Sequence, residues 1–559
     1  MTDSSSDADR PRLDRRAFIA SVSAVPIAAS TSAAAANSNV DSSRTPDAVG
    51  SGTAAQADTR SGRVAGYSRG GVYVFKGIPY GTTTEGTARF KPASPPTPWQ
   101  GVRSSRAYGP VCPQGARAGW NNDAEAFLMR WDDGFPGEDC LRLNIWTPAP
   151  TGKKLPVMVW LHGGGFVAGS GHELPAYDGE NLARSGEVVV VSVNHRLGPF
   201  GYLNLAEIGG AEFIESANVG MLDLVLTLTW VRDNIGNFGG DADNVTIFGQ
   251  SGGGMKVSTL MVMPSARGLF HKAMVQSGSF PLTTTSKEST SLAAALLDEL
   301  KISAKDFRQL LQVPAQQLVQ ASERAVIRTA GPRPEFLGRG GVRIGWTPTI
   351  DGRIVTAPPY SAAGAKQSPS IPLLIGCTRD EFGMHLRADP ELTEARVLEK
   401  LGRGWGEKAA EIYAKSKQLF PTESPAGLLS IIAATPLRNF DVDYANLRHA
   451  AGAAPAYSYL FTYVTPSLCG SPGAFHCADL PFCFDNVERC DSSTGNTEAA
   501  RRLGNVMSRA WINFARTGNP SQTGLGWPRH EPRTMPTMVF DVEAEVRNDP
   551  FGALRRLTL

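Results

Sequence analysis

The chain has 559 residues, of which 42% are apolar and 19% are charged, and its formal net charge is +2. This near-neutral balance argues against an extended nucleic-acid surface or an acidic tail, and no apolar run reaches the about 20 residues that span a bilayer. The length suits one large α/β domain or several small domains.

Residues 1–36 have the pattern of an export signal. Arg15 and Arg16 precede an apolar stretch from Ala17 to Ala29, and a run of alanines at 33–36 offers an A-x-A cleavage site. Because paired arginines followed by apolar residues are typical of the twin-arginine type, we expect a secreted or extracytoplasmic protein. An amphipathic N-terminal helix is the alternative interpretation.

Residues 37–60 are rich in Ser, Thr, Ala, Gly and Asp and show no periodicity, which predicts a disordered leader. The folded domain is expected to begin near Ser61 and to occupy residues 61–559. There, short apolar runs alternate with helical patterns, which predicts a mainly parallel sheet with helices on its faces. The expected strands are Leu155–Leu161, Val188–Val193, Val245–Phe248 and Ile371–Gly376, and Leu222–Val231 is expected to form an amphipathic helix.

Seven cysteines can oxidise if the chain leaves the cytoplasm. Cys112 and Cys140 flank an aromatic-rich loop, and we expect a disulfide between them. Cys377 ends an apolar run, which favours a buried free thiol. For the four remaining cysteines, clustered in one segment, three pairings stay open: Cys469, Cys477, Cys483 and Cys490.

A glycine-rich loop follows the strand expected at Leu155–Leu161. His162 is followed by Gly163, Gly164, Gly165 and Phe166. Consecutive glycines let backbone N–H groups converge on a small anion without side chains in the way, as in the loops that supply oxyanion donors in esterases. A plain glycine-rich turn is the alternative.

The stretch VTIFGQSGGG, Val245 to Gly254, predicts a short strand, a glycine-rich turn and then a helix that Pro264 stops. Ser251 lies at the turn with glycine two residues to either side, which is the G-x-S-x-G spacing of a nucleophile elbow. The serine must adopt a strained backbone conformation there, and a side chain at either flanking glycine would collide with the turn.

Many segments of the chain resemble type-B carboxylesterases of the α/β-hydrolase fold, the group that includes cholinesterases, carboxylesterases and some fungal lipases. The matching segments include FKGIPYG, GEDCLRLNIWTP, VWLHGGGF, VNHRLGPFGYL, GLFHKAMVQSGS, RDEFG, GAFHCADLPFCF and WINFARTGNP. The resemblance runs through almost the whole chain after residue 60. It implies one α/β-hydrolase domain with long insertions and a serine esterase that needs no metal or organic cofactor.

The resemblance also implies the roles of individual residues. Ser251 would be the nucleophile, Glu381 of RDEFG the acid and His476 of GAFHCADLPF the base, in the chain order of α/β-hydrolases. From the residues alone Asp380 would be an equal candidate for the acid. Three N–H groups would supply the oxyanion donors, those of Gly164, Gly165 and Gly252, and two structural ion pairs would be Arg89 with Glu138 and Arg196 with Asp223.

The chain departs from the family pattern around the nucleophile. Relatives usually carry glutamate before the serine and alanine after it, whereas this chain has Gln250 and Gly252. A glycine still offers its N–H group, but a buried negative charge near His476 is gone. The cysteines around His476 are also denser than the family leads us to expect.

The substrate pocket is suggested only by position. Where cholinesterases place aromatic acyl-pocket residues this chain reads GVRIGW, so Val342 and Ile344 would line a roomier acyl site, and Trp131 would lie at the entrance. The implied activity is hydrolysis of small-molecule carboxylic esters through an acyl-enzyme. The alternatives are acyl transfer on the same scaffold and, with less support, a non-catalytic binding module.

Overall fold

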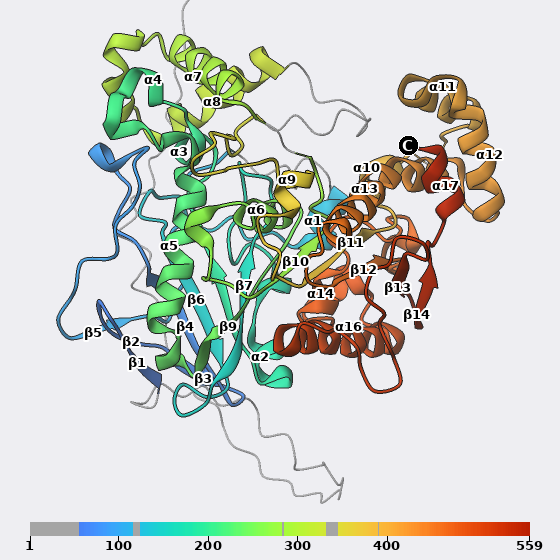
Figure 1. The fold of residues 1–559 in the computed structure, drawn as a ribbon, viewed down its shortest axis with the longest axis horizontal. Helices are drawn as coiled ribbons and strands as arrows, with labels where there is room; N and C mark the ends of the chain where they lie inside the picture. The colour runs from blue at the N-terminus through green and yellow to red at the C-terminus, as the bar shows by residue number, and fades with distance from the viewer. Residues whose placement is uncertain (1–54, 116–122, 282–283, 331–344, 390) are drawn as a thin grey trace, which may run out of the picture. The chain divides into compact units, whose positions relative to one another are not determined.

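The computed structural model describes residues 55–115, 123–281, 284–330, 345–389 and 391–559 (Figure 1). The expected export signal, residues 1–36, lies outside the described residues. Everything below concerns the described part of the unit that residues 47–559 form.

This unit is built on an 11-stranded sheet with the order β14-β13-β12-β11-β10-β9-β7-β8-β6-β4-β3. The run from β8 through β7, β9, β10, β11 and β12 to β13 is parallel, and antiparallel strands lie at both edges. A small second sheet has the order β1-β2-β5. The strands are β1 Gln56–Thr59, β2 Gly62–Ala65, β3 Tyr67–Arg69, β4 Val72–Pro79, β5 Val102–Ser104, β6 Arg142–Thr147, β7 Leu155–Leu161, β8 Val189–Val193, β9 Gly240–Gln250, β10 Lys272–Gln276, β11 Leu373–Thr378, β12 Ala456–Phe461, β13 Pro536–Phe540 and β14 Ala544–Asn548.

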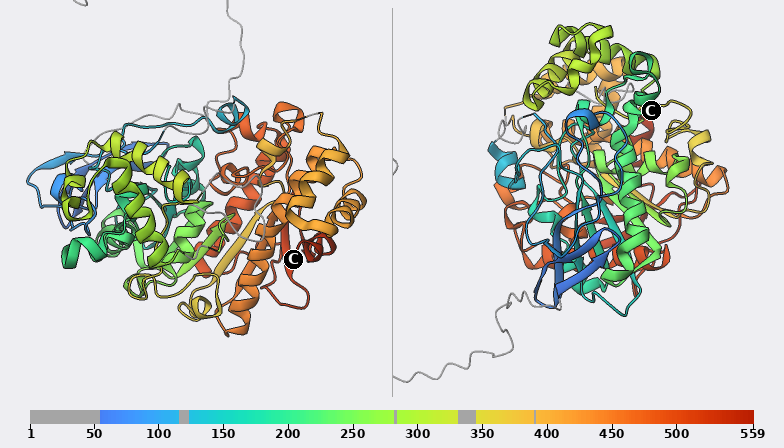
Figure 2. Two further views of the ribbon diagram at one scale, coloured as in Figure 1. Left: turned by 90° about the horizontal axis from the view of Figure 1, so that it is seen from above. Right: turned by 90° about the vertical axis from the view of Figure 1, so that its left-hand side faces the viewer.

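Helices cover both faces of the large sheet (Figures 1 and 2). Two groups extend from it: α7 and α8 pack together near α4, and α11 and α12 pack beside α17 (Figure 1). The helices are α1 Asp123–Met129, α2 Glu180–Gly186, α3 Gly198–Tyr202, α4 Ala206–Gly209, α5 Val219–Asn234, α6 Gly252–Leu260, α7 Ser286–Leu300, α8 Ala315–Ala330, α9 Ala362–Ala365, α10 Gly383–Leu386, α11 Glu394–Trp405, α12 Ala409–Leu419, α13 Pro425–Ala450, α14 Leu480–Cys483, α15 Asp491–Thr494, α16 Glu498–Thr517 and α17 Gly552–Leu557.

The central strand β7 is apolar along its whole length because both of its faces are covered. All seven residues of β7 are buried. Its alternate side chains enter different hydrophobic clusters: Val159 packs in the cluster that contains α5 and α6 residues, whereas Trp160 packs in the cluster that contains α2 and α16 residues. This two-sided burial explains why a continuous apolar run, rather than an alternating one, marks a parallel strand here.

Two expectations need correction. The helix expected at Leu222–Val231 lies within α5. It does not have one exposed face and one buried face, because Arg232 is the only exposed residue among positions 219–234. It is covered by the sheet and by α3, α6 and neighbouring segments, so few positions reach water. The expected end of the disordered leader, residue 60, is also wrong, because residues Gln56–Thr59 form a strand that pairs antiparallel with Gly62–Ala65.

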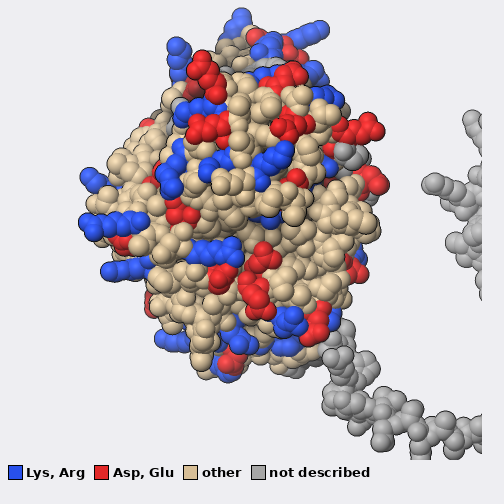
Figure 3. Space-filling model, turned by 90° about the vertical axis from the view of Figure 1, so that its right-hand side faces the viewer, with Lys and Arg blue, Asp and Glu red and all other residues tan. Residues whose placement is uncertain are grey.

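The surface carries intermixed charges on the face that bears α11, α12 and α17 (Figure 3). Blue and red side chains are interspersed there rather than gathered by sign. In the described part of the chain, no single helix combines the length and apolar character needed to cross a membrane; one sharply bent pair, residues 206–213 with 216–238, passes that test by length and composition only.

Candidate active site

Ser251 stands at a sharp turn between the end of β9 and the start of α6. Its φ of 55° and ψ of −125° lie outside the regions that L-residues normally adopt, which is the strained conformation expected of a nucleophile elbow. A Cβ on Gly249 would lie 2.5 Å from the backbone carbon of Gly253, and a Cβ on Gly253 would lie 1.9 Å from the carbonyl oxygen of Leu161. The two flanking glycines are therefore required by backbone packing.

Glu381 follows β11 and its side chain is fully buried. One carboxylate oxygen accepts a hydrogen bond of 2.8 Å from the N–H of Thr378, and the other contacts Nδ1 of His476. The neighbouring Asp380 instead binds Arg379 and Arg387, at 2.9 and 2.7 Å. The structure therefore brings Glu381, not Asp380, to the imidazole.

His476 lies against the residue that precedes Ser251. Its side chain is 27% exposed, and the amide nitrogen of Gln250 is 3.1 Å from Nε2 and 3.3 Å from Nδ1. Each ring nitrogen directs its N–H group or lone pair outward in the ring plane, and the two directions diverge. The amide nitrogen of Gln250 is close to both nitrogens, so it must lie over the face of the ring. The amide therefore leaves the in-plane direction from Nε2 open.

The charge of His476 is controlled by burial and by two neighbours. Burial opposes the charged ring, but Cys477 and the Glu381 carboxylate outweigh burial and raise the pKa of His476 well above its ordinary value. The Cys477 thiol donates a 3.2 Å hydrogen bond to Oε1 of Gln250, so it fixes the amide that packs on the ring. In the described residues no hydrogen bond joins Ser251 Oγ to His476, a contact that in free hydrolases often tightens only when substrate binds.

The glycine-rich loop faces the start of α6. Gly164 and Gly165 have φ values of +78° and +62°, a region that side-chain-bearing residues rarely adopt. A Cβ on Gly252 would lie 2.2 Å from the carbonyl oxygen of Gly165 and 2.4 Å from its nitrogen. The structure therefore brings together the backbone of the three residues whose N–H groups were expected to serve as oxyanion donors.

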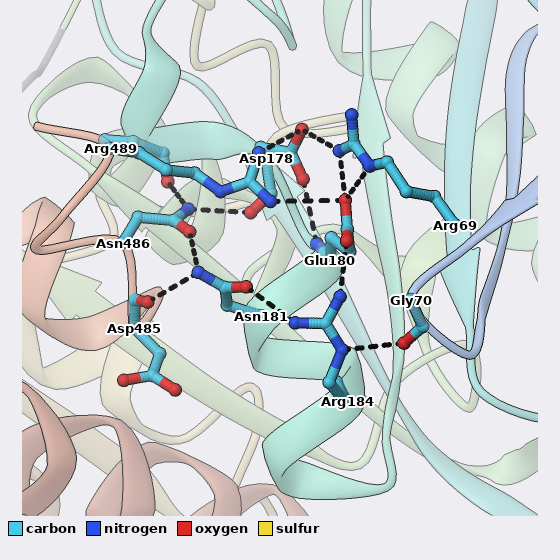
Figure 4. A network of polar contacts seen from close by, with 10 residues as sticks. Arg69, Gly70, Asp178, Glu180, Asn181, Arg184, Asp485, Asn486 and Arg489 are labelled. Carbon is cyan, nitrogen blue, oxygen red and sulfur yellow. Dashed lines mark hydrogen bonds and ion pairs between the residues drawn. The ribbon is translucent and has the colours of Figure 1, made fainter. Parts of the chain in front are cut away.

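The segment after His476 is fastened to α2 and to the residues just before it by a polar network (Figure 4). Glu180 is contacted by the guanidinium groups of Arg69, Arg184 and Arg489. The side-chain amide of Asn486 donates to the carbonyl oxygens of Ala176 and Asp178, at 2.9 and 2.7 Å. These contacts join three distant parts of the chain and hold in place the segment that follows His476.

The two structural ion pairs that the resemblance implied are present. Arg89 binds Glu138 at 2.6 and 2.5 Å, and both residues are buried. Arg196 and Asp223 form the same kind of bidentate pair, with distances of 2.8 and 2.6 Å. The expected pairs are confirmed.

The disulfide expected between Cys112 and Cys140 is not formed in the structure, where both are free and buried. The two thiols nevertheless contact each other, since a hydrogen bond between Cys140 and Cys112, together with burial, raises the pKa of Cys140 well above its usual value. An S–S bond requires oxidation as well as proximity. Cys377 is buried and free as expected, and none of the open pairings is formed by Cys469, Cys477, Cys483 or Cys490.

The residues suggested for the substrate pocket receive little support. Val342 and Ile344 lie outside the described residues. Trp131 is partly buried and packs against the hydrophobic cluster that contains Leu128 and Leu174. Its place at the entrance stays a prediction. In the described ranges no three His, Cys, Asp or Glu side chains form a group that could hold a metal ion.

Sequence reasoning missed two polar residues beside the site. The sequence marks Cys477 only as a disulfide candidate, although it touches Gln250. The signal for Lys256 is that it is the lone lysine in the otherwise uncharged helix GGGMKVSTL. Its side chain is completely buried.

Comparison with known proteins places the chain in a family. Residues 53–553 match the carboxylesterase family. The chain is 36% identical over 508 residues to the para-nitrobenzyl esterase of Bacillus subtilis (strain 168), a match that covers 89% of this chain and 97% of that one. With phenmedipham hydrolase of Pseudarthrobacter oxydans it shares 34% identity over 503 residues, covering 88% and 96%.

Solved structures agree with this assignment. An esterase from anaerobic Clostridium hathewayi that can hydrolyse aliphatic aromatic polyesters superimposes with a TM-score of 0.79 at 36% identity, covering 92% of this chain and 99% of that one. A para-nitrobenzyl esterase superimposes with a TM-score of 0.76 at 34% identity, covering 91% and 100%. The expected α/β-hydrolase fold is confirmed.

Proposed function

Because this chain belongs to the carboxylesterase family and is a carboxylic ester hydrolase, we propose that it works through an acyl-enzyme formed on Ser251, with His476 as base and Glu381 as acid. The observation that carries the proposal is the contact between the buried Glu381 carboxylate and Nδ1 of His476, next to the strained turn at Ser251. A carboxylate on Nδ1 fixes the tautomer in which Nε2 is free to accept a proton.

In the proposed first step Ser251 Oγ attacks the ester carbonyl carbon while Nε2 of His476 takes the hydroxyl proton. The imidazolium that forms is stabilised by Glu381. Its proton then passes to the leaving alkoxide, and the alcohol departs. Water attacks the acyl-enzyme in the second half of the cycle, with His476 again as base, and releases the carboxylic acid and free Ser251.

The tetrahedral intermediates of both steps carry a negative charge on the former carbonyl oxygen. We assign its stabilisation to the N–H groups of Gly164, Gly165 and Gly252. Such donors act strongly because they are fixed before the charge develops, and losing one costs about 2.7 to 4 kcal/mol of transition-state stabilisation. The positive φ values of the loop glycines support this role, since they let the backbone turn its N–H groups toward one point.

The experiment is covalent labelling with a fluorophosphonate probe, coupled to turnover of a soluble p-nitrophenyl ester. Ser251→Ala should abolish both labelling and turnover with an unchanged unfolding temperature. A matched control is Ser258→Ala, because Ser258 is a buried serine on the helix that follows Ser251, and its hydroxyl donates to the carbonyl of Met255 at 3.0 Å. Labelling that survives in Ser251→Ala would place the nucleophile elsewhere.

The natural ester is a separate question. Relatives named for p-nitrobenzyl esters, phenmedipham and aliphatic aromatic polyesters suggest aromatic esters as the first substrates to test. A panel that varies acyl chain and alcohol independently would define the preference. Competing alcohol and amine acceptors in the same assay would separate hydrolysis from acyl transfer by the products formed.

We also propose that residues 1–36 direct export by the twin-arginine route. The support is the paired Arg15 and Arg16 before an apolar stretch. Fractionation of a bacterial host should find the esterase outside the cytoplasm, and Arg15→Lys with Arg16→Lys should retain it inside. Export of this double variant at the normal rate would contradict the proposal.

A further inference from the structure

We propose that Lys256 is a positioning residue for the oxyanion loop, Gly163–Gly165, and that it acts by holding the backbone carbonyl groups of His162 and Gly163. The inference rests on the proposed function, since it assigns the loop to the oxyanion. It concerns a residue that touches no reacting atom.

Lys256 reaches the loop from behind. It lies on α6, five residues after Ser251, and none of it is exposed. Its Nζ donates a 2.9 Å hydrogen bond to the carbonyl oxygen of His162 and lies 3.5 Å from that of Gly163. The ring of Phe166, at the other end of the loop, has its centroid 5.7 Å from Nζ. One amine therefore contacts both ends of the loop.

This burial is costly and needs an explanation. A lysine ordinarily extends its amine to water, and an ammonium group buried without adequate partners is strongly destabilising. Burial lowers the pKa of Lys256 to about 7, against the attraction of Glu173, and His195 is a further titratable neighbour. An apolar side chain would fill the same space without that cost, so the hydrogen bonds to the loop are the specific contribution of the amine.

The planarity of the peptide unit links these carbonyl groups to the oxyanion donors. The carbonyl of Gly163 and the N–H of Gly164 belong to one rigid trans peptide, in which they point in opposite directions. When the carbonyl points back toward Nζ, the N–H of Gly164 points to the other side, where an oxyanion would be bound. Nδ1 of His162 contacts the same carbonyl oxygen at 3.0 Å, so that group has two polar neighbours.

The loop needs such an anchor because its own sequence gives little rigidity. Three consecutive glycines have the largest conformational freedom of any residues, and Gly164 and Gly165 occupy the left-handed region. Donors stabilise a transition state only if they are already oriented when the charge develops. Removing the amine should therefore reduce transition-state stabilisation while leaving ground-state binding intact.

The test compares two inhibitors on Lys256→Met. An aryl trifluoromethyl ketone accepts the Oγ of Ser251 at its carbonyl carbon; the C=O π bond opens to an alkoxide that binds the oxyanion donors, and the serine proton moves to His476. The matching methyl ketone binds the same pocket without forming this adduct. We expect kcat and trifluoromethyl ketone affinity each to fall about a hundredfold. KM and methyl ketone affinity should stay unchanged.

A matched control is Lys272→Met. Lys272 is also a buried lysine whose pKa is lowered by burial, but its Nζ binds Asn244. It should keep the wild-type ratio of the two inhibitor affinities. Equal losses for both ketones in Lys256→Met, or no loss for either, would overturn the inference.

Failure of the proposed function has a different signature: the wild-type enzyme would then not prefer the trifluoromethyl ketone at all. Should Lys256→Met fail to fold, Lys256→Gln carries the same comparison, because its side chain is one bond shorter and cannot place its donor where Nζ contacts the two carbonyl oxygens. Hydrogen exchange gives an independent readout. The amides of residues 162–166 should exchange about tenfold faster in the variant, with β13 unchanged, and equal exchange in this loop would contradict the anchoring role.

Discussion

Asp380 and Ala474 bind each other twice: the N–H of Asp380 donates to the carbonyl oxygen of Ala474 at 3.0 Å, and the N–H of Ala474 donates to Oδ2 of Asp380 at 3.0 Å. Glu381 is the next residue after the first partner, and His476 is two residues after the second. This reciprocal clamp therefore sets the separation of Glu381 and His476. It also explains why two adjacent carboxylates have different partners.

The first prediction separates those two carboxylates. Glu381→Gln should lower kcat by about 10⁴-fold, as expected when the imidazole loses its orienting carboxylate, with little change in unfolding temperature. Asp380→Asn should instead destabilise the fold by about 3 kcal/mol, because it leaves Arg379 and Arg387 without their buried partner. Steady-state kinetics and urea unfolding of both variants test this, and the reverse pattern would make Asp380 the acid.

The second prediction concerns Gln250. A carboxylate at this position would lie against the ring of His476 and favour the imidazolium, which raises its pKa. Since the active base is the neutral ring, activity is lost as pH falls through this pKa, so Gln250→Glu should move the acid limb of kcat/KM to higher pH. Because the pKa of His476 lies well above the ordinary histidine value of about 6.5, the profile should run from about pH 6 well into the alkaline range. A limb that stays fixed or moves to lower pH would show that position 250 is not coupled to the base.

The third prediction concerns Gly252, where relatives usually carry alanine. The oxyanion loop approaches so closely that a methyl group would overlap the backbone of Gly165. Gly252→Ala should displace the loop and reduce kcat about a hundredfold, the cost of misplacing catalytic groups by about 1 Å. Gly163→Ala is the comparison, since its Cβ would meet nothing closer than 3.4 Å and should have a much smaller effect. An equal fall in kcat for the two variants would contradict the conclusion that the close contact between Gly252 and Gly165 excludes a side chain at position 252.

The fourth prediction is that exported protein contains a disulfide between Cys112 and Cys140. The two thiols are buried together, and closing a loop of this length can stabilise the fold by roughly 3 to 4 kcal/mol in the chain-entropy model. Peptide mapping without reduction should recover both cysteines in one linked fragment. Free thiols at both positions in exported material would show that the contact remains unoxidised.

The fifth prediction concerns acid stability. Burial acts to raise the pKa of Glu180, but hydrogen bonding and charge from Arg69, with the charges of Arg489 and Arg184, lower it overall. A depressed carboxylate pKa stabilises the fold above the unfolded value of about 4.3, and this stability is lost as pH falls through the folded pKa.

Glu180→Gln should accordingly lower the free energy of unfolding at pH 7 by about 1 to 2 kcal/mol, because solvent screens its part-exposed arginine partners, and it should weaken the dependence of that free energy on pH below about 5. Urea unfolding at several pH values measures both effects. Glu498→Gln is the control, because Glu498 forms an exposed pair with Arg502 and should change stability by at most about 0.5 kcal/mol. If the two variants lose similar amounts of unfolding free energy, the network around Glu180 contributes no more to stability than an exposed ion pair.

The sequence by itself determined the local features of the site. The apolar run at Leu155–Leu161 became β7 with the expected bounds, because both faces of a central parallel strand are buried and the pattern is unambiguous. The spacing of Gly249, Ser251 and Gly253 determined the elbow, since backbone contacts there exclude a side chain. These inferences depend on neighbours a few residues apart.

Only the tertiary structure decided which groups meet across long separations. From the residues alone Asp380 and Glu381 were equivalent, and the fold distinguished them by placing Arg379 and Arg387 beside one and His476 beside the other. Lys256 was uninformative until the fold buried it behind the glycine-rich loop. Burial and charge partners depend on segments distant in the chain, and a side chain's chemical role follows from those partners rather than from its own sequence context.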